Sequence, residues 1–157
     1  MQSFLYSLYT NYISLFSLAC FMDTGYKISD LMVQKVLATT PATTVRQCAK
    51  LMSDKKIGSL VVADDKKIMG IVTEQDMSRK VVAAGLDYEA PVSEIMTKKL
   101  VDIMPTDDIY TAMVRMSKYN IKHLPVVHGG KLVGIISFKD IIRANPSLIE
   151  KWNVGGR

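Results

Sequence analysis

The sequence predicts a mixed α/β (α+β) fold made of two pseudo-symmetric β-α-β-β-α units, and three observations lead to this prediction. The 157 residues suit one compact domain or two very small ones, and 48% of them are apolar. Residues 28–79 superimpose without a gap on residues 92–143 after a shift of 64 positions. Both copies show the same order of helical and strand patterns. Two copies with so long a period indicate a pair of units that share a core, not a solenoid.

Identical residues recur along the whole repeat, which sets the boundaries of the chain's parts. We expect an apolar N-terminal extension (1–27), a first repeat (28–86), a second repeat (92–150) and a C-terminal tail (151–157). The identical pairs include Ser29/Ser93, Met32/Met96, Pro41/Pro105, Met52/Met116, Leu60/Leu124, Gly70/Gly134, Asp76/Asp140 and Arg79/Arg143.

Each repeat is expected to open with a short helical turn capped by Ser29 or Ser93. A brief strand follows at residues 36–38 or 100–102. Thr43-Thr44 and the cluster 106–108 then cap a helix. The spacing i, i+3, i+4, i+7 predicts its buried face, which is Val45, Cys48, Ala49 and Met52 in the first repeat and Ile109, Ala112, Met113 and Met116 in the second.

Two strands and a second helix complete each repeat. The strands are predicted at 60–62 and 68–72, and at 124–127 and 132–136. Polar turns at 64–66 and 128–130 join them, and the last helix begins at Thr73 or Ser137.

The junction of the last strand and the last helix carries the pattern G-h-h-[ST]-x-x-D in both repeats, at residues 70–76 and 134–140. Its simplest interpretation is a helix start with a hydroxyl cap and an acidic residue three positions later. The functional interpretation uses the same geometry: the helix start and hydroxyl suit a phosphate, and the Asp accepts from a ribose diol. Two copies in register, each followed by an Arg (Arg79, Arg143), favour the functional interpretation.

With these motifs, together with residues 57–62 and 123–127, the chain resembles a tandem pair of CBS domains, the family named after cystathionine β-synthase. The resemblance spans residues 28 to about 146. It implies two repeats packed sheet to sheet about a pseudo-two-fold axis, with two clefts that bind adenosine compounds. It further implies a stand-alone regulatory member of the family.

The resemblance also implies that each cleft takes residues from both repeats. One cleft would use Ser137 and Asp140, and the other would use Thr73 and Asp76. Lys122 and His123 match positions that reach phosphates in some members. Gln75 stands where many stand-alone members have Arg, so we expect unequal clefts, the Ser137/Asp140 cleft being the stronger. The further residues are Thr39 or Thr40 with Ile57, Gly58 and Ser59 for the Ser137/Asp140 cleft, and Ile103 or Met104 with Ile121, Lys122 and His123 for the Thr73/Asp76 cleft.

We therefore expect a non-enzymatic regulatory module that binds AMP, ADP or ATP and passes its occupancy to a downstream protein that the sequence does not identify. The alternative is a constitutive dimerisation scaffold with degenerate clefts. An enzyme is not favoured, because His123 is the one plausible acid–base residue. The basic residues favour a phosphorylated ligand over S-adenosylmethionine, whose sulfonium is cationic. Nucleic acid is not favoured either, because the net charge of +5 is spread along the chain without interleaved aromatic residues.

Cysteine usage points to the cytoplasm and to no metal or cofactor. Cys20 and Cys48 have no CxxC spacing and lie far from both histidines, which argues against zinc and against a disulfide framework. Cys48 is most simply a small core residue.

Residues 1–22 contain no charge, and three interpretations stay open. They are a weakly constrained leader with Met22 as an alternative start, a helix packed on the domain or a partner chain, and, least favoured, a membrane contact. A second copy of the module is the most economical cover for such a helix, which predicts a homodimer that requires no membrane.

Overall fold

The computed structural model describes residues 24–65 and 67–148, in which the mixed α/β fold is confirmed. The predictions for residues 1–22 and for the C-terminal tail lie outside the described residues. The chain divides into two compact units. Of the described residues, the Asp76 unit comprises those within Val33–Asp102 and Val127–Ile135, and the Asp140 unit comprises residues 24–32, Ile103–Val126 and residues 136–148.

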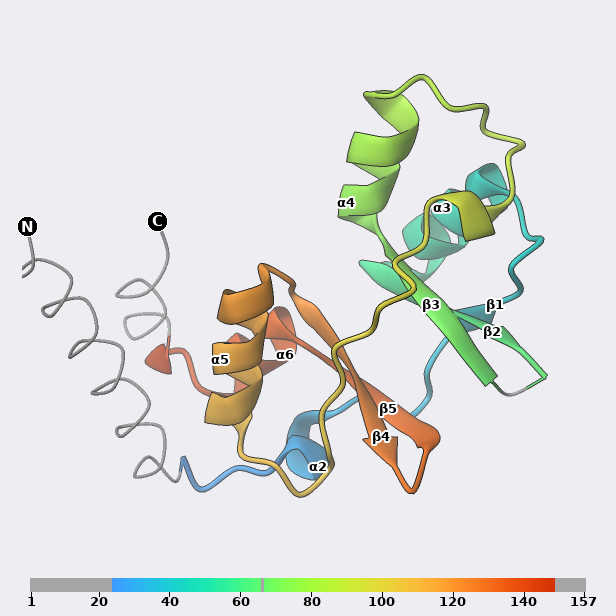
Figure 1. Cartoon of the computed structure of the whole chain (residues 1–157). Coiled ribbons are helices and arrows are strands. Elements are labelled where there is room, and N and C mark those ends of the chain that lie inside the picture. The colour runs from blue at the N-terminus through green and yellow to red at the C-terminus, as the bar shows by residue number, and fades with distance from the viewer. Residues whose placement is uncertain (1–23, 66, 149–157) are drawn as a thin grey trace, which may run out of the picture. The chain divides into compact units, whose positions relative to one another are not determined.

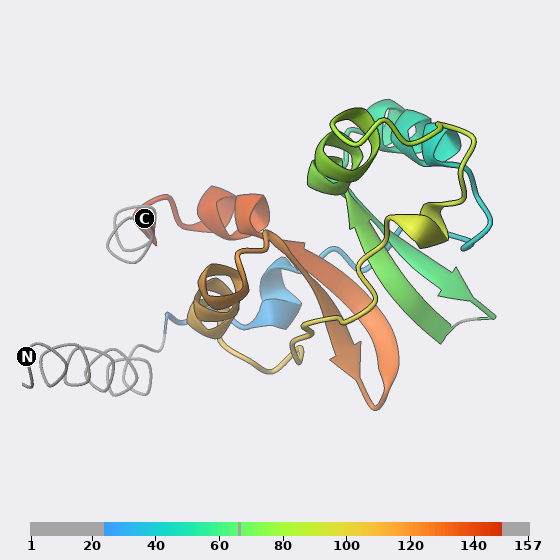
Figure 2. The ribbon, with the colours of Figure 1, turned by 45° about the horizontal axis from the view of Figure 1, so that its top comes forward.

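The first repeat supplies the main elements of the Asp76 unit. Strand β2 pairs antiparallel with β3 and parallel with β1, in the order β1-β2-β3. Helix α3 packs against β2 and against the π-helical turn η1 (Figures 1 and 2). Its N-terminus is fixed as predicted, because the Thr44 hydroxyl accepts from the Gln47 amide at 3.2 Å. The elements are β1 (Ala38–Thr39), α3 (Val45–Lys55), β2 (Ser59–Asp64), β3 (Lys67–Thr73), α4 (Glu74–Asp76) and η1 (Met77–Val82).

The second repeat forms its elements in the same order, with a single bridge in place of a first strand and one α-helix in place of α4 and η1. Strands β4 and β5 form a two-stranded sheet, and the turn between them uses the positive φ angles of Gly129 and Gly130. Asp108 caps α5, as predicted, by accepting from the Tyr110 amide at 2.8 Å. The elements are a 3₁₀ turn η2 (Val92–Glu94), α5 (Ile109–Tyr119), β4 (His123–His128), β5 (Lys131–Ser137) and α6 (Phe138–Ala144).

The predicted first strands at 36–38 and 100–102 are placed too early. In the first repeat the paired residues are Ala38 and Thr39, which lie opposite Val61 and Val62. In the second repeat a single bridge joins Ile103 to Val126. The register is set by the long buried strands β2 and β4, which the local pattern of the short segments does not reveal.

The two repeats exchange their first segments. Helix α2 (Ile28–Leu31) belongs to the first repeat but packs in the Asp140 unit, where it contacts α6 (Figure 1). The amides of Ile28 and Ser29 donate to the carbonyls of Asp107 and Pro105, each at 2.9 Å. The equivalent amides of Val92 and Ser93 donate to the carbonyls of Thr43 and Pro41 in the Asp76 unit, at 2.8 and 3.2 Å.

This exchange explains why Ser29 and Ser93 are not the helix caps that the sequence predicts. The N-cap residues are Lys27 and Pro91, and both serines lie inside their helical turns. The first amides of each turn donate to backbone carbonyls of the other repeat, so a capping hydroxyl is not needed.

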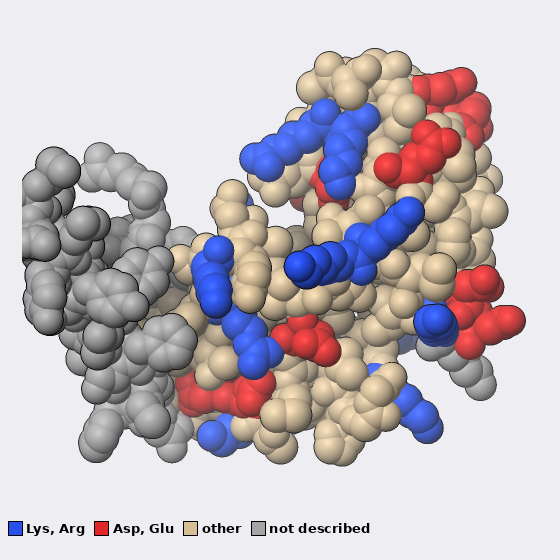
Figure 3. Space-filling model, viewed as in Figure 1, with Lys and Arg blue, Asp and Glu red and all other residues tan. Residues whose placement is uncertain are grey.

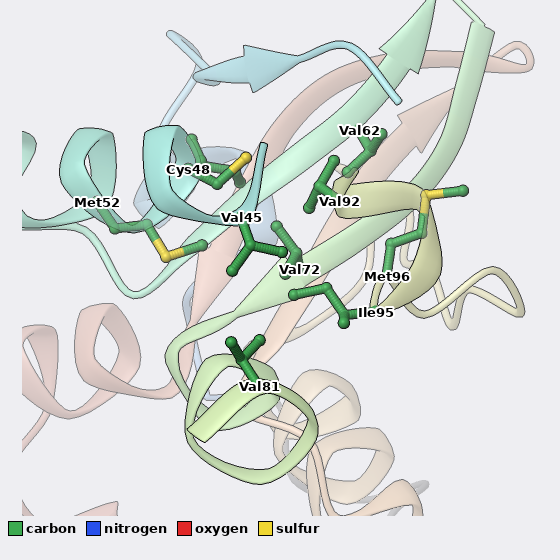
Figure 4. Close-up of a cluster of buried hydrophobic side chains, with 10 residues drawn as sticks. Val45, Cys48, Met52, Val62, Val72, Val81, Val92, Ile95 and Met96 are labelled. Atoms are coloured by element: carbon green, nitrogen blue, oxygen red, sulfur yellow. The ribbon is translucent and has the colours of Figure 1, made fainter. Parts of the chain in front are cut away.

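The core of the Asp76 unit contains residues of both repeats (Figure 4). Val92, Ile95 and Met96 of the second repeat pack with a cluster from α3, the sheet and η1. Cys48 is fully buried in this cluster, and burial raises the pKa of its thiol, as expected for a core residue. Ala49 is exposed, so its predicted place on the buried face of α3 is wrong. The cluster is Val45, Cys48, Met52, Leu60, Val62, Val72, Val81, Val92, Ile95 and Met96.

Gly70 allows strand β3 of the first repeat to lie close to Met96 and Thr97 of the second repeat. Thr97 bridges Ile71, with amide–carbonyl distances of 3.1 and 2.8 Å. A Cβ at position 70 would lie 2.8 Å from the Thr97 carbonyl oxygen and 2.9 Å from Met96 Sδ. The glycine that opens the repeated motif is therefore required here by packing.

Among the described residues, no helix offers a stretch long and apolar enough to cross a membrane.

We expect Ile28→Ala to lower the free energy of unfolding by about 2–5 kcal/mol, because a fully buried isoleucine leaves a cavity. The matched control is Val33→Ala, five positions later and 46% exposed, which should change it by no more than about 0.5 kcal/mol. Urea denaturation of both variants gives the comparison. Equal losses would show that α2 is not held in the core.

Gly70→Ala should lower the free energy of unfolding by about 1–3 kcal/mol, because the added methyl group overpacks the contact with Thr97. Met69→Ala, at a neighbouring position that is 38% exposed, is the control and should be close to neutral. An alanine that is tolerated at position 70 as well as at 69 would contradict the close approach. The same denaturation measurement decides.

Candidate functional site

Thr73 and Asp76 form a closed hydrogen-bonded pair at the start of α4. Asp76 Oδ2 accepts from the Thr73 amide at 2.9 Å and from the Thr73 hydroxyl at 2.7 Å. The Asp76 amide donates to Thr73 Oγ1 at 3.2 Å. This is the capping box that the sequence predicts, and it fixes the carboxylate relative to the end of β3.

Ser137 and Asp140 repeat this geometry at the start of α6. Asp140 Oδ2 accepts from the Ser137 amide at 3.0 Å and from the Ser137 hydroxyl at 2.5 Å. The Asp140 amide donates to Ser137 Oγ at 3.2 Å. The two pairs match bond for bond at positions 64 apart, so the duplicated motif produces a duplicated local structure.

Within the Asp76 unit, the start of β2 lies beside the Thr73 pair. Ser59 is opposite Thr73 in the β2–β3 register, and the Glu74 amide donates to the Gly58 carbonyl at 3.1 Å. Ile57 and Gly58 are half-buried, and Ser59 is 9% exposed. These three positions are thus adjacent to the hydroxyl–carboxylate pair of their own repeat.

The predicted threonines of the same unit lie at and after β1. Thr39 Oγ1 accepts a weak hydrogen bond from Cys48 Sγ at 3.9 Å. Thr40 is exposed, and its hydroxyl lies 3.0 Å from that of Thr43.

The Asp140 unit holds the equivalent residues of the second repeat. The Phe138 amide donates to the Lys122 carbonyl at 2.9 Å, the counterpart of the Glu74–Gly58 bond. Lys122 is exposed, whereas Ile121 and His123 are half-buried. Ile103 is buried and Met104 is 54% exposed.

Lys80 contacts the predicted ligand residue Asp76, and the sequence-based predictions do not include it. Lys80 Nζ lies 2.7 Å from Asp76 Oδ1 and donates to the Ile95 carbonyl at 2.6 Å. The i, i+4 spacing of Asp76 and Lys80 on a helix is the signal that could have suggested it. Arg79, the arginine that follows the motif and that we used to favour its functional interpretation, is exposed.

A mostly apolar hollow lies elsewhere in the Asp76 unit and contains none of the predicted ligand residues. The hollow is lined by Val45, Arg46, Ala49, Met77, Val81, Val82 and Tyr88.

Between residues 24 and 148, apart from residue 66, no three His, Cys, Asp or Glu side chains are grouped to hold a metal ion.

Comparison with known proteins identifies the repeat. The sequence model of the CBS domain matches residues 28–83 and 92–147. The CBS domain-containing protein YhcV of Bacillus subtilis (strain 168) is 31% identical over 114 residues, which cover 73% of this chain and 81% of YhcV.

Solved structures show the same similarity. A conserved protein from Pyrococcus horikoshii is 35% identical with a TM-score of 0.74, covering 78% of this chain and 94% of that one. The CBS domain pair of the protein MJ0100, in complex with 5′-methylthioadenosine and S-adenosyl-L-methionine, is 26% identical with a TM-score of 0.71. That match covers 78% of this chain and 97% of the MJ0100 chain.

Proposed function

The chain belongs to the CBS domain family, and on that premise we propose that it is a non-enzymatic regulatory module that binds an adenine nucleotide, AMP, ADP or ATP. The observation that carries the proposal is the duplicated hydroxyl–carboxylate pair, Thr73/Asp76 and Ser137/Asp140. Each carboxylate is held in place before a ligand arrives, so binding does not require ordering of its side chain.

The ligands of a structural relative support the adenosine part of this proposal. The MJ0100 domain pair holds 5′-methylthioadenosine and S-adenosyl-L-methionine, which share adenosine. A ribose diol has two hydroxyl donors, and a carboxylate accepts both of them. Asp76 and Asp140 occupy the two positions that the family resemblance gives to this contact.

The phosphate part of the proposal depends on the basic residues near the motifs. Lys122, Arg79 and Arg143 are exposed, and so are available to pair with a phosphate. On the face shown in Figure 3, the basic side chains of each unit lie among acidic and uncharged ones, which suits a small anion better than a nucleic acid.

The remaining assignments follow the family resemblance and form part of the proposal. At the Ser137/Asp140 site, the residues around the base would be Thr39 or Thr40 with Ile57, Gly58 and Ser59. At the Thr73/Asp76 site, the corresponding residues would be Ile103 or Met104 with Ile121, Lys122 and His123. We further propose a cytoplasmic homodimer. A scaffold with degenerate clefts is the competing function, because the same carboxylates already serve as helix caps.

A thermal-shift panel with AMP, ADP, ATP, S-adenosylmethionine and NADH tests the proposed function. A ligand that binds the native state raises the melting temperature as its concentration exceeds its Kd. A melting temperature that none of the five ligands moves would favour the scaffold.

Asp140→Ala should weaken AMP binding about ten- to a hundredfold, because it removes charged hydrogen bonds worth roughly 1.5–3 kcal/mol. The control is Asp108→Ala, which removes a helix cap of the same unit but no proposed ligand contact. Calorimetric titration of both variants, after their melting temperatures are compared, separates binding from stability. Unchanged affinity in Asp140→Ala would mean that this carboxylate is a helix cap alone.

AMP should bind more tightly than adenosine, and the difference should shrink as salt is raised. The physical reason is that pairing of phosphate with exposed lysine and arginine side chains is screened by ions. Titration of both ligands between low and high ionic strength measures the effect. Equal affinities across the salt series would rule out a phosphate subsite.

A further inference from the structure

The side chain of Lys80 is held at two points beside a proposed ribose-binding carboxylate. Its ammonium lies 2.7 Å from Asp76 Oδ1 and donates to the Ile95 carbonyl at 2.6 Å. The Asp76 side chain is 13% exposed and the Lys80 side chain is 44% exposed, so the ion pair is sheltered on the carboxylate side and open to solvent on the lysine side. A second anchor on backbone fixes the ammonium better than a surface ion pair alone would.

The ion pair adds a third partner to the Asp76 carboxylate. Oδ2 already accepts from the amide and the hydroxyl of Thr73. Lys80 occupies one of the two acceptor positions of Oδ1. A ribose diol at Asp76 would therefore compete with a cation for the one oxygen that the helix cap leaves over.

The second repeat has the same cap without the cation. Asp140 Oδ2 accepts from Ser137 as its counterpart does from Thr73, and the position equivalent to Lys80 is Ala144. Within 24–65 and 67–148, Asp140 takes part in no ion pair. The two carboxylates thus differ by one side chain four residues further along the helix.

We propose that Lys80 is a specificity-determining residue that closes the Asp76 site to ribose, so that each chain binds one adenine nucleotide, at Asp140. This inference rests on the proposed function, since it concerns the same two carboxylates. According to this proposal, the two sites differ in ribose binding because the Asp76 carboxylate is paired with Lys80.

The test is the number of AMP molecules bound per chain, measured by calorimetric titration of the full chain. The wild type should bind about one AMP, and Asp140→Ala should weaken this binding about ten- to a hundredfold. Lys80→Met keeps most of the apolar stem but removes the charge, and should raise the number to about two. The matched control is Lys50→Met, which breaks another i, i+4 ion pair of the same unit, with Asp54, and should leave the number at one.

The reverse exchange tests the same idea with Lys80 intact. Ala144→Lys places an ammonium one turn beyond Asp140, on the helix that contacts α2, and should weaken AMP binding about tenfold or more. In the double variant Lys80→Met/Ala144→Lys, binding should become sensitive to Asp76→Ala instead of Asp140→Ala. The single variant Ala144→Lys also covers the case in which Lys80→Met does not fold, which the melting temperature of Lys80→Met would reveal.

The outcomes separate this inference from the proposed function. Two AMP molecules on the wild type, or one on a folded Lys80→Met variant, would overturn the closure by Lys80 and leave the proposed function standing. Weaker binding in Lys80→Met would also overturn it, because Lys80 would then contact the nucleotide. AMP binding to none of the variants or the wild type would overturn the proposed function itself, and the inference with it.

Discussion

The rest of the structure depends on the exchange of short segments between the two repeats. A unit of about 60 residues buries so little apolar surface that its stability alone is marginal. Here Val92, Ile95 and Met96 of the second repeat enter the core of the Asp76 unit, while Ile28 of the first repeat is fully buried in the Asp140 unit. The same segments donate their first amides to carbonyls of the other repeat, so burial and hydrogen bonding are satisfied together. Neither repeat contains a complete core of its own.

The position of the candidate site follows from this framework. The end of β3 and the end of β5 each deliver a hydroxyl and a carboxylate to the start of a helix, with matching hydrogen bonds. Because the carboxylates serve as caps, they are rigid, which favours recognition of a ligand with fixed geometry. The same bonds leave each Asp one oxygen that the cap does not use, and in our proposal the neighbour of that oxygen decides what the site can accept. In the proposed function, a structural role and a binding role coexist in one side chain.

The surroundings of the two duplicated caps differ. The helix after Asp76 continues into a π-helical turn, whereas the helix after Asp140 is α-helical to Ala144. Lys80 and Ala144 occupy equivalent positions, and only the former can bridge a carboxylate to a neighbouring backbone carbonyl. Local irregularities of this kind are frequent at functional sites.

The sequence by itself determined the repeat, the order of the elements and the caps at Thr44, Asp108, Thr73 and Ser137. These features depend on side chains and amides two or three residues apart, so a local pattern is sufficient to reveal them. Only the tertiary structure decided which repeat receives each first segment, why position 70 must be glycine and where the ammonium of Lys80 is anchored. Each of these rests on a contact between residues distant along the chain, such as Ile28 with Asp107 or Gly70 with Thr97. Spacing within a segment carries no information about such contacts, because they arise from the packing of one segment against another.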